Sequence, residues 1–318
     1  MVFGRRISLP LLLAAMAMLL PVLATPGRAG AVTATYLFDL STFTGTVPFD
    51  WARGCADSVN KEVYVAFGDT IRIFNNTGME IYRLGTYDIG AGMITGMTID
   101  AAGDLLLLSY KASYDYSVIV SDFRGRRKVE FTIQGLPPAF KDFYPNSIFY
   151  RDGKLYLASL PELKIVVTDP SGKFLDGYDV APLIGVKDED RRENDMFAFS
   201  VTAQGEMIFT IPSAGKAYVL NPDRTIKEFG KRGSGPGKFG VPAGIAADQQ
   251  GNIYVSDTLR SVVLIFGKDL GFITEFGGRG LAPGKFIAPR DIFVDGDNRV
   301  YVTQLRKRGI SVYKIQEE

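Results

Sequence analysis

The sequence predicts an all-β fold: a single six-bladed β-propeller over residues 32–318, with four antiparallel strands in each blade. Three observations predict it. The chain has 318 residues, 46% hydrophobic and 22% charged, which is enough for a large globular core. Short β-rich runs separated by Gly- or Asp-containing turns make up residues 32–318, and no ten-residue helical pattern interrupts them. A sequence repeat recurs through six units.

The first 31 residues predict a signal peptide rather than part of the fold. Arg5 and Arg6 precede an apolar run over residues 7–24, and small residues follow up to Ala31. This order is typical of a secretory signal peptide. A transmembrane anchor, the alternative, needs about 20 unbroken apolar residues, and two prolines interrupt this run. We therefore expect cleavage near Ala31 and an exported protein, periplasmic or secreted, without stable membrane insertion afterwards.

Composition excludes several classes of function. The chain has no histidine and one cysteine, so triads with histidine, histidine-ligated zinc or haem, and internal disulfides are excluded. Residues 1–31 hold three arginines and no acid; without them, 33 basic residues face 35 acidic ones, a formal net charge of −2. Nucleic-acid binding is therefore not expected.

The repeat is clearest near the C-terminus. Residues 229–242 and 276–289, which lie 47 residues apart, are identical at nine of fourteen aligned positions. Tyr254, in the following Gly-Asn-Ile-Tyr-Val-Ser-Asp stretch, anchors an alignment of all six units, whose spacings are 42, 50, 52, 46 and 47 residues. The six anchor positions are Tyr64, Leu106, Tyr156, Ile208, Tyr254 and Tyr301.

Each unit contains the same order of elements. An apolar run leads to a turn, then to the run with the anchor, then to a third and a fourth β-rich run, as expected for hairpin-connected strands. The first runs should contain core positions at Cys55, Met97, Ile148, Phe199, Ile245 and Ile292. The third runs are Thr70–Phe74, Ser117–Ser121, Lys164–Thr168, Lys216–Leu220, Val262–Phe266 and Ile310–Lys314.

The last unit lacks a fourth run, because the sequence ends shortly after Lys314. An unassigned apolar run, residues 34–40, precedes the first unit. We therefore expect the N-terminal strand to complete the last blade, which would remove an exposed sheet edge.

With these motifs in place, the chain resembles the NHL-repeat family of six-bladed propellers. The resemblance rests on Phe-Gly…Gly-Lys-Phe…Pro, Gly-Ile-Ala-Ala-Asp and Gly-Asn-Ile-Tyr-Val-Ser-Asp; residues 229–277 match closely, residues 286–304 well, and the first four units in outline. It implies the fold more specifically than an activity, because propellers host many functions.

Three conspicuous features have structural interpretations. Gly237-Lys238 and Gly284-Lys285 depart twice from the phosphate-loop pattern, so we interpret them as inter-blade connections. Cys55 falls in the predicted core column and should be buried and inert. The charged run 187–195 lacks calcium-loop spacing and contains arginines, which favours a solvated loop.

The candidate site follows from the two faces of a propeller. Inter-blade links and the loops between second and third strands open on one face, where the inner strands begin. The longest examples are Val180–Met196 and Lys111–Tyr116, so we expect the binding surface on this loop-rich face, around the channel mouth. The candidate ligand- or partner-binding residues are Trp51, Arg53, Asn146, Asp257, Arg260 and Arg290.

The resulting prediction is an exported, non-enzymatic binding or scaffold propeller that engages a protein or a small extracellular ligand. The alternative is a hydrolase resembling six-bladed lactonases, with a metal in the channel held by oxygen ligands such as Asn146 and Asp257. Arg53 and Arg290 would repel a cation there, so we expect no catalytic metal. We also assign no catalytic residue and no cofactor. The histidine-dependent zinc site of amidating lyases is absent, and RNA recognition is disfavoured by charge and export.

Overall fold

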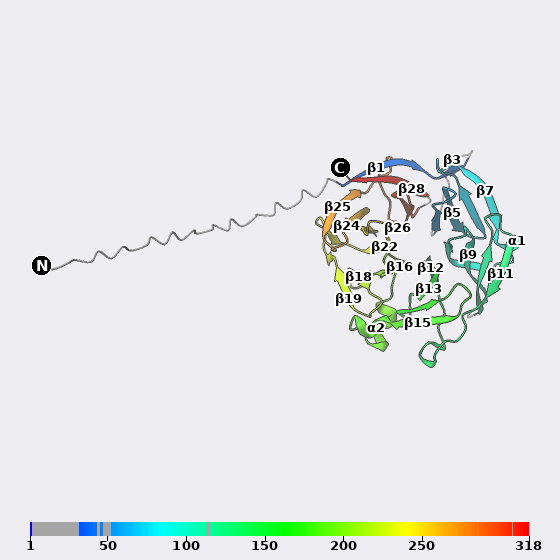
Figure 1. Ribbon diagram of the computed structural model, residues 1–318. Helices are drawn as coiled ribbons and strands as arrows, with labels where there is room; N and C mark the ends of the chain where they lie inside the picture. The colour runs from blue at the N-terminus through cyan, green and yellow to red at the C-terminus, as the bar shows by residue number, and fades with distance from the viewer. Residues whose placement is uncertain (2–31, 43–44, 47–51, 113–114, 307, 318) are drawn as a thin grey trace. The chain divides into compact units, whose positions relative to one another are not determined.

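The computed structural model describes residues 1, 32–42, 45–46, 52–112, 115–306 and 308–317. Val32–Glu318 form one compact unit, in which six four-stranded antiparallel sheets surround a central axis (Figure 1). The predicted six-bladed propeller is confirmed. Among the described residues, no helix is both long and apolar enough to cross a membrane.

The blades follow one another along the chain. Blades 1 and 2 consist of β4 (Arg53–Asp57), β5 (Glu62–Phe67), β6 (Thr70–Phe74), β7 (Glu80–Gly85), then β8 (Met93–Ile99), β9 (Leu105–Ala112), β10 (Asp115–Ser121) and β11 (Arg127–Phe131). Blades 3 and 4 consist of β12 (Ser147–Arg151), β13 (Lys154–Ser159), β14 (Lys164–Thr168), β15 (Phe174–Asp179), then β16 (Ala198–Val201), β17 (Met207–Ile211), β18 (Lys216–Leu220) and β19 (Ile226–Phe229).

The last two blades complete the ring. They consist of β22 (Pro242–Ala247), β23 (Ile253–Asp257), β24 (Val262–Phe266), β25 (Phe272–Gly277), then β26 (Pro289–Val294), β27 (Arg299–Gln304), β28 (Ile310–Glu317) and β1 (Val32–Asp39). Short elements occupy the connections: β2 (Ser41–Thr42), β3 (Gly45–Thr46), β20 (Lys231–Arg232), β21 (Lys238–Phe239), α1 (Thr86–Ile89), α2 (Val180–Leu183), and the 3-10 turns Pro138–Phe140 and Asp188–Glu193.

Blade 6 joins the two ends of the propeller, as the sequence predicted. β1 pairs antiparallel with β28, from Val32 opposite Glu317 to Asp39 opposite Ser311. Tyr36 lies edge-on to Tyr313, with ring centroids 5.7 Å apart. The strand from the start of the propeller therefore forms the outer edge of its last blade.

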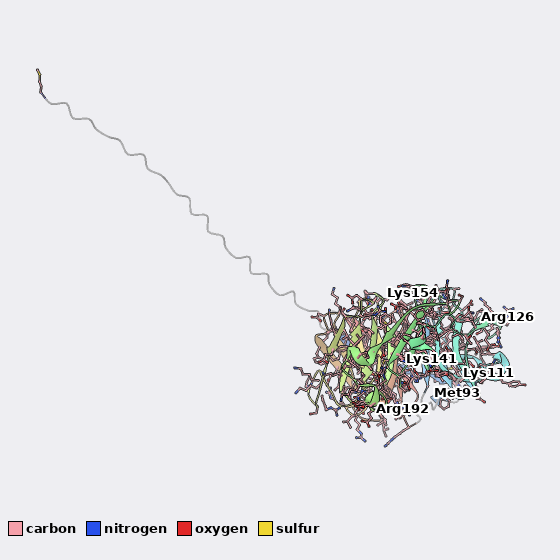
Figure 2. The ribbon with its side chains drawn as sticks, turned by 90° about the horizontal axis from the view of Figure 1, so that it is seen from below. Met93, Lys111, Arg126, Lys141, Lys154 and Arg192 are labelled. Carbon is pink, nitrogen blue, oxygen red and sulfur yellow. The ribbon has the colours of Figure 1, made fainter. Side chains whose placement is uncertain are left out.

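The two faces of the ring carry different connections (Figure 2). We call the face where the inner strands begin the linker face; Met93, Lys111 and Arg192 lie there. The opposite face, which holds the turns between first and second strands, is the turn face, and Lys154 lies on it. The two long insertions thus share one face, as expected.

Aspartates at the ends of the inner strands stabilise the turns on the turn face. The Asp248 carboxylate accepts hydrogen bonds from the backbone N–H groups of Gln250 (3.0 Å) and Asn252 (2.8 Å) and from the Tyr254 hydroxyl (2.8 Å). Short polar side chains commonly stabilise turns in this way. Asp248, the last residue of the Gly-Ile-Ala-Ala-Asp motif, therefore stabilises a turn. The equivalent turn-capping residues in other blades are Asp57, Asp100, Thr202 and Asp295.

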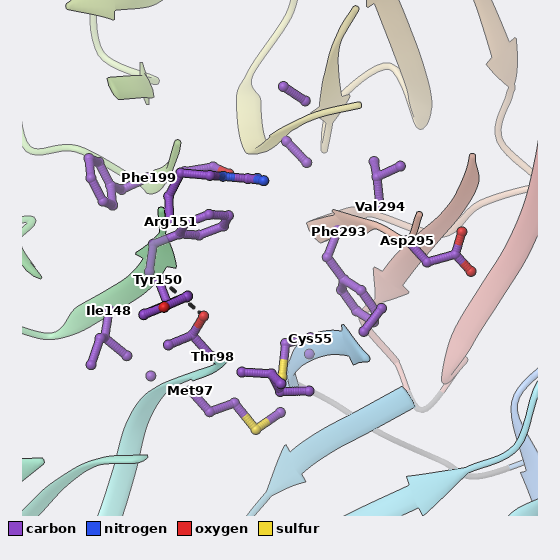
Figure 3. A pocket seen from close by; sticks show the side chains of 18 of the residues that line it. Cys55, Met97, Thr98, Ile148, Tyr150, Arg151, Phe199, Phe293, Val294 and Asp295 are labelled. Carbon is purple, nitrogen blue, oxygen red and sulfur yellow. Dashed lines mark hydrogen bonds between the residues drawn. The ribbon is translucent and has the colours of Figure 1, made fainter. Parts of the chain in front are cut away.

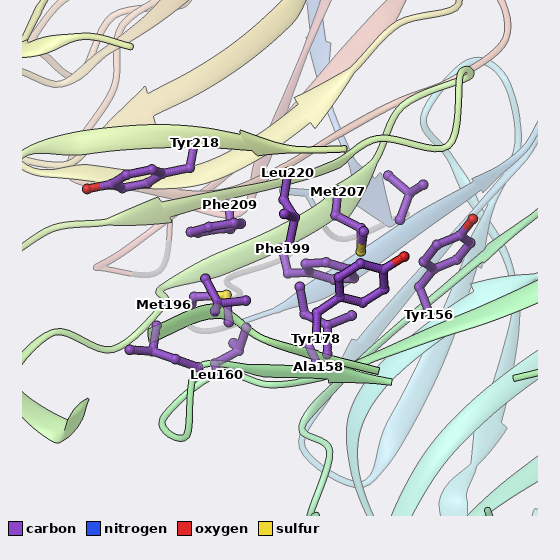
Figure 4. Close-up of a cluster of buried hydrophobic side chains, with 14 of the residues drawn as sticks. Tyr156, Ala158, Leu160, Tyr178, Met196, Phe199, Met207, Phe209, Tyr218 and Leu220 are labelled. Atoms are coloured by element: carbon purple, nitrogen blue, oxygen red, sulfur yellow. The ribbon is translucent and has the colours of Figure 1, made fainter. Parts of the chain in front are cut away.

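Apolar side chains pack between neighbouring blades. Between blades 3 and 4, Phe199 lies in a buried cluster with Leu160, Met196 and Met207 (Figure 4). The rings of Phe209 and Tyr218 stack beside it, with centroids 5.2 Å apart. Five similar clusters fill the other blade interfaces. The core is therefore a ring of inter-blade layers around the channel.

The predicted inner-strand column is correct in five blades and shifted by one residue in blade 1. Ile245 pairs with Val255, one position after the anchor Tyr254, whereas Cys55 pairs with Tyr64 itself. The residue in the column is Gly54, opposite Val65. Val65 follows its partner Gly54 by 11 positions, whereas Val255 follows its partner Ile245 by 10. Counting back a fixed distance from the anchor therefore selected the wrong residue in blade 1.

A neighbouring aromatic ring takes up the space beside Gly54. A Cβ at Gly54 would lie 2.0 Å from Cε1 of Phe293. The Phe293 ring stacks on Tyr301, with centroids 4.8 Å apart and planes 1° from parallel. Cys55 instead packs toward blade 2, in the cluster that contains Met97.

Candidate functional site: the central channel

The inner strands of all six blades enclose a cavity of about 440 Å³. Its lining includes residues of β4, β8, β12, β16, β22 and β26, because these strands converge on the axis. Turn residues such as Val59, Gly153 and Gly296 also line it, so the cavity extends to the turn face. The hollow therefore reaches the face opposite the one on which the candidate binding residues were predicted.

The linker-face end of the channel carries mixed charge. Arg53 Nη1 lies 3.9 Å from Asp291 Oδ2. Burial raises the pKa of Asp291, although the Arg53 cation opposes that shift. The Arg290 guanidinium lies over the Phe197 ring, 4.4 Å from its centroid, and burial together with the Arg53 charge lowers the Arg290 pKa to about 10. Arg290 is therefore still a cation at neutral pH.

Arg151 extends into the channel from the end of β12. Figure 3 shows its side chain extending from the strand toward the open middle of the channel, which Arg151 lines. Its Cζ lies 5.5 Å from the Phe149 ring centroid, and Nη2 donates a long hydrogen bond, 3.4 Å, to the Val201 carbonyl. Its Nε is buried and has no hydrogen-bond partner among the described residues. The channel thus contains a guanidinium group with an unmet donor.

The local turn explains why an arginine can occupy this position. Arg151 stands where other blades have a turn-capping Asp or Thr, because it pairs with Lys154 as Asp57 pairs with Glu62. The blade 3 turn consists of only Asp152 and Gly153, both with positive φ (48° and 73°). A two-residue turn of this kind closes the hairpin directly, so a capping side chain is not needed.

Acidic side chains surround the turn-face end of the cavity, but most are engaged in turns. Two arginines, Arg53 and Arg151, line the cavity together with six aspartates. The aspartates are Asp57, Asp100, Asp152, Asp248, Asp291 and Asp295. Asp57 accepts from two backbone N–H groups and from the Asn60 amide. Over the described ranges, no group of three or more acidic or cysteine side chains is placed to hold a metal ion.

The predicted site residues separate into two groups. Arg53 lines the cavity, and Arg290 lies near it, since its charge and that of Arg53 interact. Asn146 and Arg260 lie in connections between strands, and Asp257 is the last residue of β23. Trp51 lies outside the described residues.

The second group stabilises the linker face rather than facing the channel. Asn146 Oδ1 accepts the Leu160 N–H at 3.0 Å. Asp257 is fully buried and accepts backbone N–H groups of Gly240 (2.6 Å) and Arg260 (2.8 Å). Arg260 donates to Glu275 Oε1 at 2.6 Å and to the Lys238 carbonyl at 2.8 Å. Their side-chain oxygens and cations therefore already have structural partners.

Two other sequence features can now be placed. Cys55 was expected to be buried, but it is only partly buried and lines the cavity. Desolvation, together with the Asp57 charge, raises the pKa of its thiol, which favours the protonated form. The run 187–195 lies at the surface, as expected, and contains a 3-10 turn, Asp188–Glu193, in which no residue is buried. Arg191 fixes it, with Nη1 2.7 Å from Asp179 Oδ1 and Nη2 2.7 Å from Asp188 Oδ1.

Sequence reasoning missed Arg151 and Asp291. Arg151 carried a usable signal, because it breaks the column of turn-capping residues at the ends of the inner strands. Asp291 carried no such signal, because an aspartate next to an inner-strand arginine is as compatible with the solvent-exposed rim of the channel as with its lining.

Comparisons with known proteins agree with the fold. Residues 245–317 match a family model described as a 6-bladed beta-propeller. No curated protein matches the sequence. A protein of unknown function from Bacteroides thetaiotaomicron is similar in structure, with a TM-score of 0.64 and 12% identity over 90% of this chain and 76% of that one.

Two similar structures are enzymes. A gluconolactonase from Xanthomonas campestris has a TM-score of 0.59 and 13% identity, over 90% of both chains. Virginiamycin B lyase from Staphylococcus aureus has a TM-score of 0.51 and 16% identity, over 90% of this chain and 89% of that one. At such identities the likeness extends to the fold and not to the chemistry. The chain is a six-bladed β-propeller.

Proposed function

We propose that this protein is an exported, non-enzymatic binding propeller whose central channel receives a small extracellular ligand or a narrow segment of a partner protein. The ligand presents a carboxylate or carbonyl oxygen to Arg151. This keeps the predicted binding role, and it shifts the main contact from the linker-face rim into the channel.

The unmet Nε of Arg151 is the observation that carries the proposal. A buried donor without an acceptor costs free energy, and an unsatisfied group in a cavity calls for an explanation. Arginine binds carboxylates in a planar, two-pronged geometry that few other side chains can offer. A ligand oxygen beside Arg151 would satisfy the donor, while Phe149 supports the flat face of the guanidinium.

The acidic residues of the lining limit which ligands fit. Six aspartates against two arginines give the cavity a formal excess of negative charge. Polyanions would be repelled, whereas a ligand with one carboxylate, or with a neutral carbonyl, gains the Arg151 contact at smaller cost. A peptide carboxyl terminus has this chemistry and is narrow enough for a channel.

Support for binding over catalysis comes from the residues that a hydrolase would need. Asn146 and Asp257, the candidate metal ligands of the alternative, accept backbone N–H groups. The raised pKa of the Cys55 thiol disfavours a nucleophile there. The lactonase alternative predicts instead that turnover appears when a divalent cation is supplied.

The test compares Arg151→Gln with Lys154→Gln, a change on the exposed turn face outside the cavity lining. Titration calorimetry with short peptides that have free carboxyl termini should show binding to the wild type and to Lys154→Gln. Loss of a charged hydrogen bond, about 1.5–3 kcal/mol, predicts about 10- to 150-fold weaker binding for Arg151→Gln.

Two results would count against the proposal. One is that no peptide binds the wild type, or that Arg151→Gln binds as tightly as Lys154→Gln. The other is hydrolysis of a lactone that requires added calcium or zinc, which would support the hydrolase.

A further inference from the structure

Four neighbouring loops on the linker face of blades 5 and 6 contain only basic charges. They are residues 230–241, 258–261, 278–288, and 305–306 with 308–309, which we call the basic loop patch. No aspartate or glutamate occurs in these four segments. Their described cations are Lys231, Arg232, Lys238, Arg260, Arg279, Lys285, Arg306 and Arg308.

Hydrogen bonds hold the four segments together as one surface. The Thr258 N–H donates to the Val241 carbonyl (3.0 Å), and the Gly278 N–H donates to the Ser261 carbonyl (2.8 Å). Arg308 Nη2 donates to the Leu281 carbonyl at 3.0 Å. Each segment therefore contacts the next, so the cations belong to one continuous patch.

Most of these cations have no acidic partner. Of the eight, only Arg260 has a carboxylate within salt-bridge distance in the part of the chain that the structure describes. Lys285 and Arg232 donate instead to neutral carbonyl groups, those of Gly277 and Ser213. Six of the eight are exposed to solvent: Lys231, Arg232, Lys238, Arg279, Lys285 and Arg306.

Exposed aliphatic side chains lie among the cations. Leu259 is 67% exposed and Leu281 is 71% exposed, and each lies within two residues of an arginine of the patch. Val241 is also exposed. These three residues lie in connections between strands rather than in the blade sheets.

We propose that the basic loop patch docks the propeller on an anionic phospholipid surface. Basic residues attract anionic headgroups, and apolar side chains between them enter the boundary between headgroups and acyl chains. An acidic protein would use the cations but would not require exposed leucines on separate loops. The combination of the two kinds of side chain therefore favours a lipid surface.

Acidic residues elsewhere on the propeller limit how it can lie on the lipid surface. The acidic 3-10 turn Asp188–Glu193 lies near the patch, because Ser213 contacts both Asn194 and Arg232. We expect a tilted contact that favours blades 5 and 6 over this turn. The turn-face end of the channel, with its aspartates, would then point away from the bilayer.

The experiment uses residues 32–318, which contain every blade strand and form one compact unit. Sedimentation with vesicles is measured for equimolar phosphatidylglycerol and phosphatidylcholine, and for phosphatidylcholine alone. We expect binding to the first and not to the second. The double variant Lys238→Gln/Arg279→Gln should bind about 30-fold more weakly, from roughly fivefold for each cation near an anionic surface.

Two further variants separate the possible partners. Leu259→Ser/Leu281→Ser should also weaken vesicle binding, whereas Lys154→Gln/Lys173→Gln, away from the patch, should not. Absence of binding to the anionic vesicles would overturn the proposal. So would unchanged binding of the leucine variant together with equal binding to soluble polyglutamate, which would identify an acidic polymer as the partner.

Discussion

The contact between Gly54 and Phe293 yields the sharpest test of how blades 6 and 1 meet. Gly54→Ala would place a methyl group 2.0 Å from Cε1 of Phe293. The ring can move only by giving up its parallel stack on Tyr301. Overpacking of this kind costs about 1–3 kcal/mol. Phe293→Ala removes the ring and should cost about 3–5 kcal/mol.

The double variant distinguishes a direct contact from two independent defects. In Gly54→Ala/Phe293→Ala the new methyl group enters space that the ring has left, so the clash disappears. Urea unfolding should show a total cost about 1–3 kcal/mol below the sum of the single variants. Gly235→Ala is the control, because a Cβ there meets only a lysine side-chain carbon at 4.0 Å. Additive costs for Gly54 and Phe293 would refute the one-residue shift in blade 1.

Three other predictions concern closure, the linker face and pH. Deletion of residues 32–41 removes the partner of β28, so the melting temperature should fall in a single transition measured by circular dichroism; an unchanged temperature would contradict this. Asp257→Ala removes a buried carboxylate that accepts the partly buried N–H groups of Gly240 and Arg260. It should lower the free energy of unfolding, measured in urea, by about 1–3 kcal/mol, whereas a change within error would exclude a structural role. Burial raises the folded-state pKa of Asp291 above its ordinary 3.8, so between these two values the folded state binds a proton that the unfolded state has lost. The stability that the protonated carboxyl contributes is therefore lost as pH rises from 3.8 through the folded-state pKa. Asp291→Asn should therefore raise the melting temperature at neutral pH but not below pH 3.8; equal shifts at both would show that the charge is irrelevant.

Repeat spacing was sufficient to predict the blades and their closure. The anchors at Tyr64, Tyr156, Tyr254 and Tyr301 all lie in second strands, because a propeller repeats the same hairpins at a nearly constant interval. The error at Cys55 has a local cause. Turn length varies by one residue between blades, and in a strand a shift of one residue exchanges the two faces.

The channel was harder to predict than the fold. Asp257 belongs to the same repeat motif whether it faces a ligand or accepts backbone N–H groups, and only three-dimensional contacts distinguish these roles. The same ambiguity affected Asn146 and Arg260, both of which stabilise loops. Arg151 interrupts the column of turn-capping residues, which the sequence shows, and its two-residue turn explains why this blade needs no cap.

Pairing of β1 with β28 also determines when the molecule can become complete. β1 precedes every other blade strand along the chain, yet its partner β28 follows all of them. Contacts between such distant segments form slowly, because a long loop must close before they contribute. Until then blade 6 has three strands at most and the ring remains open.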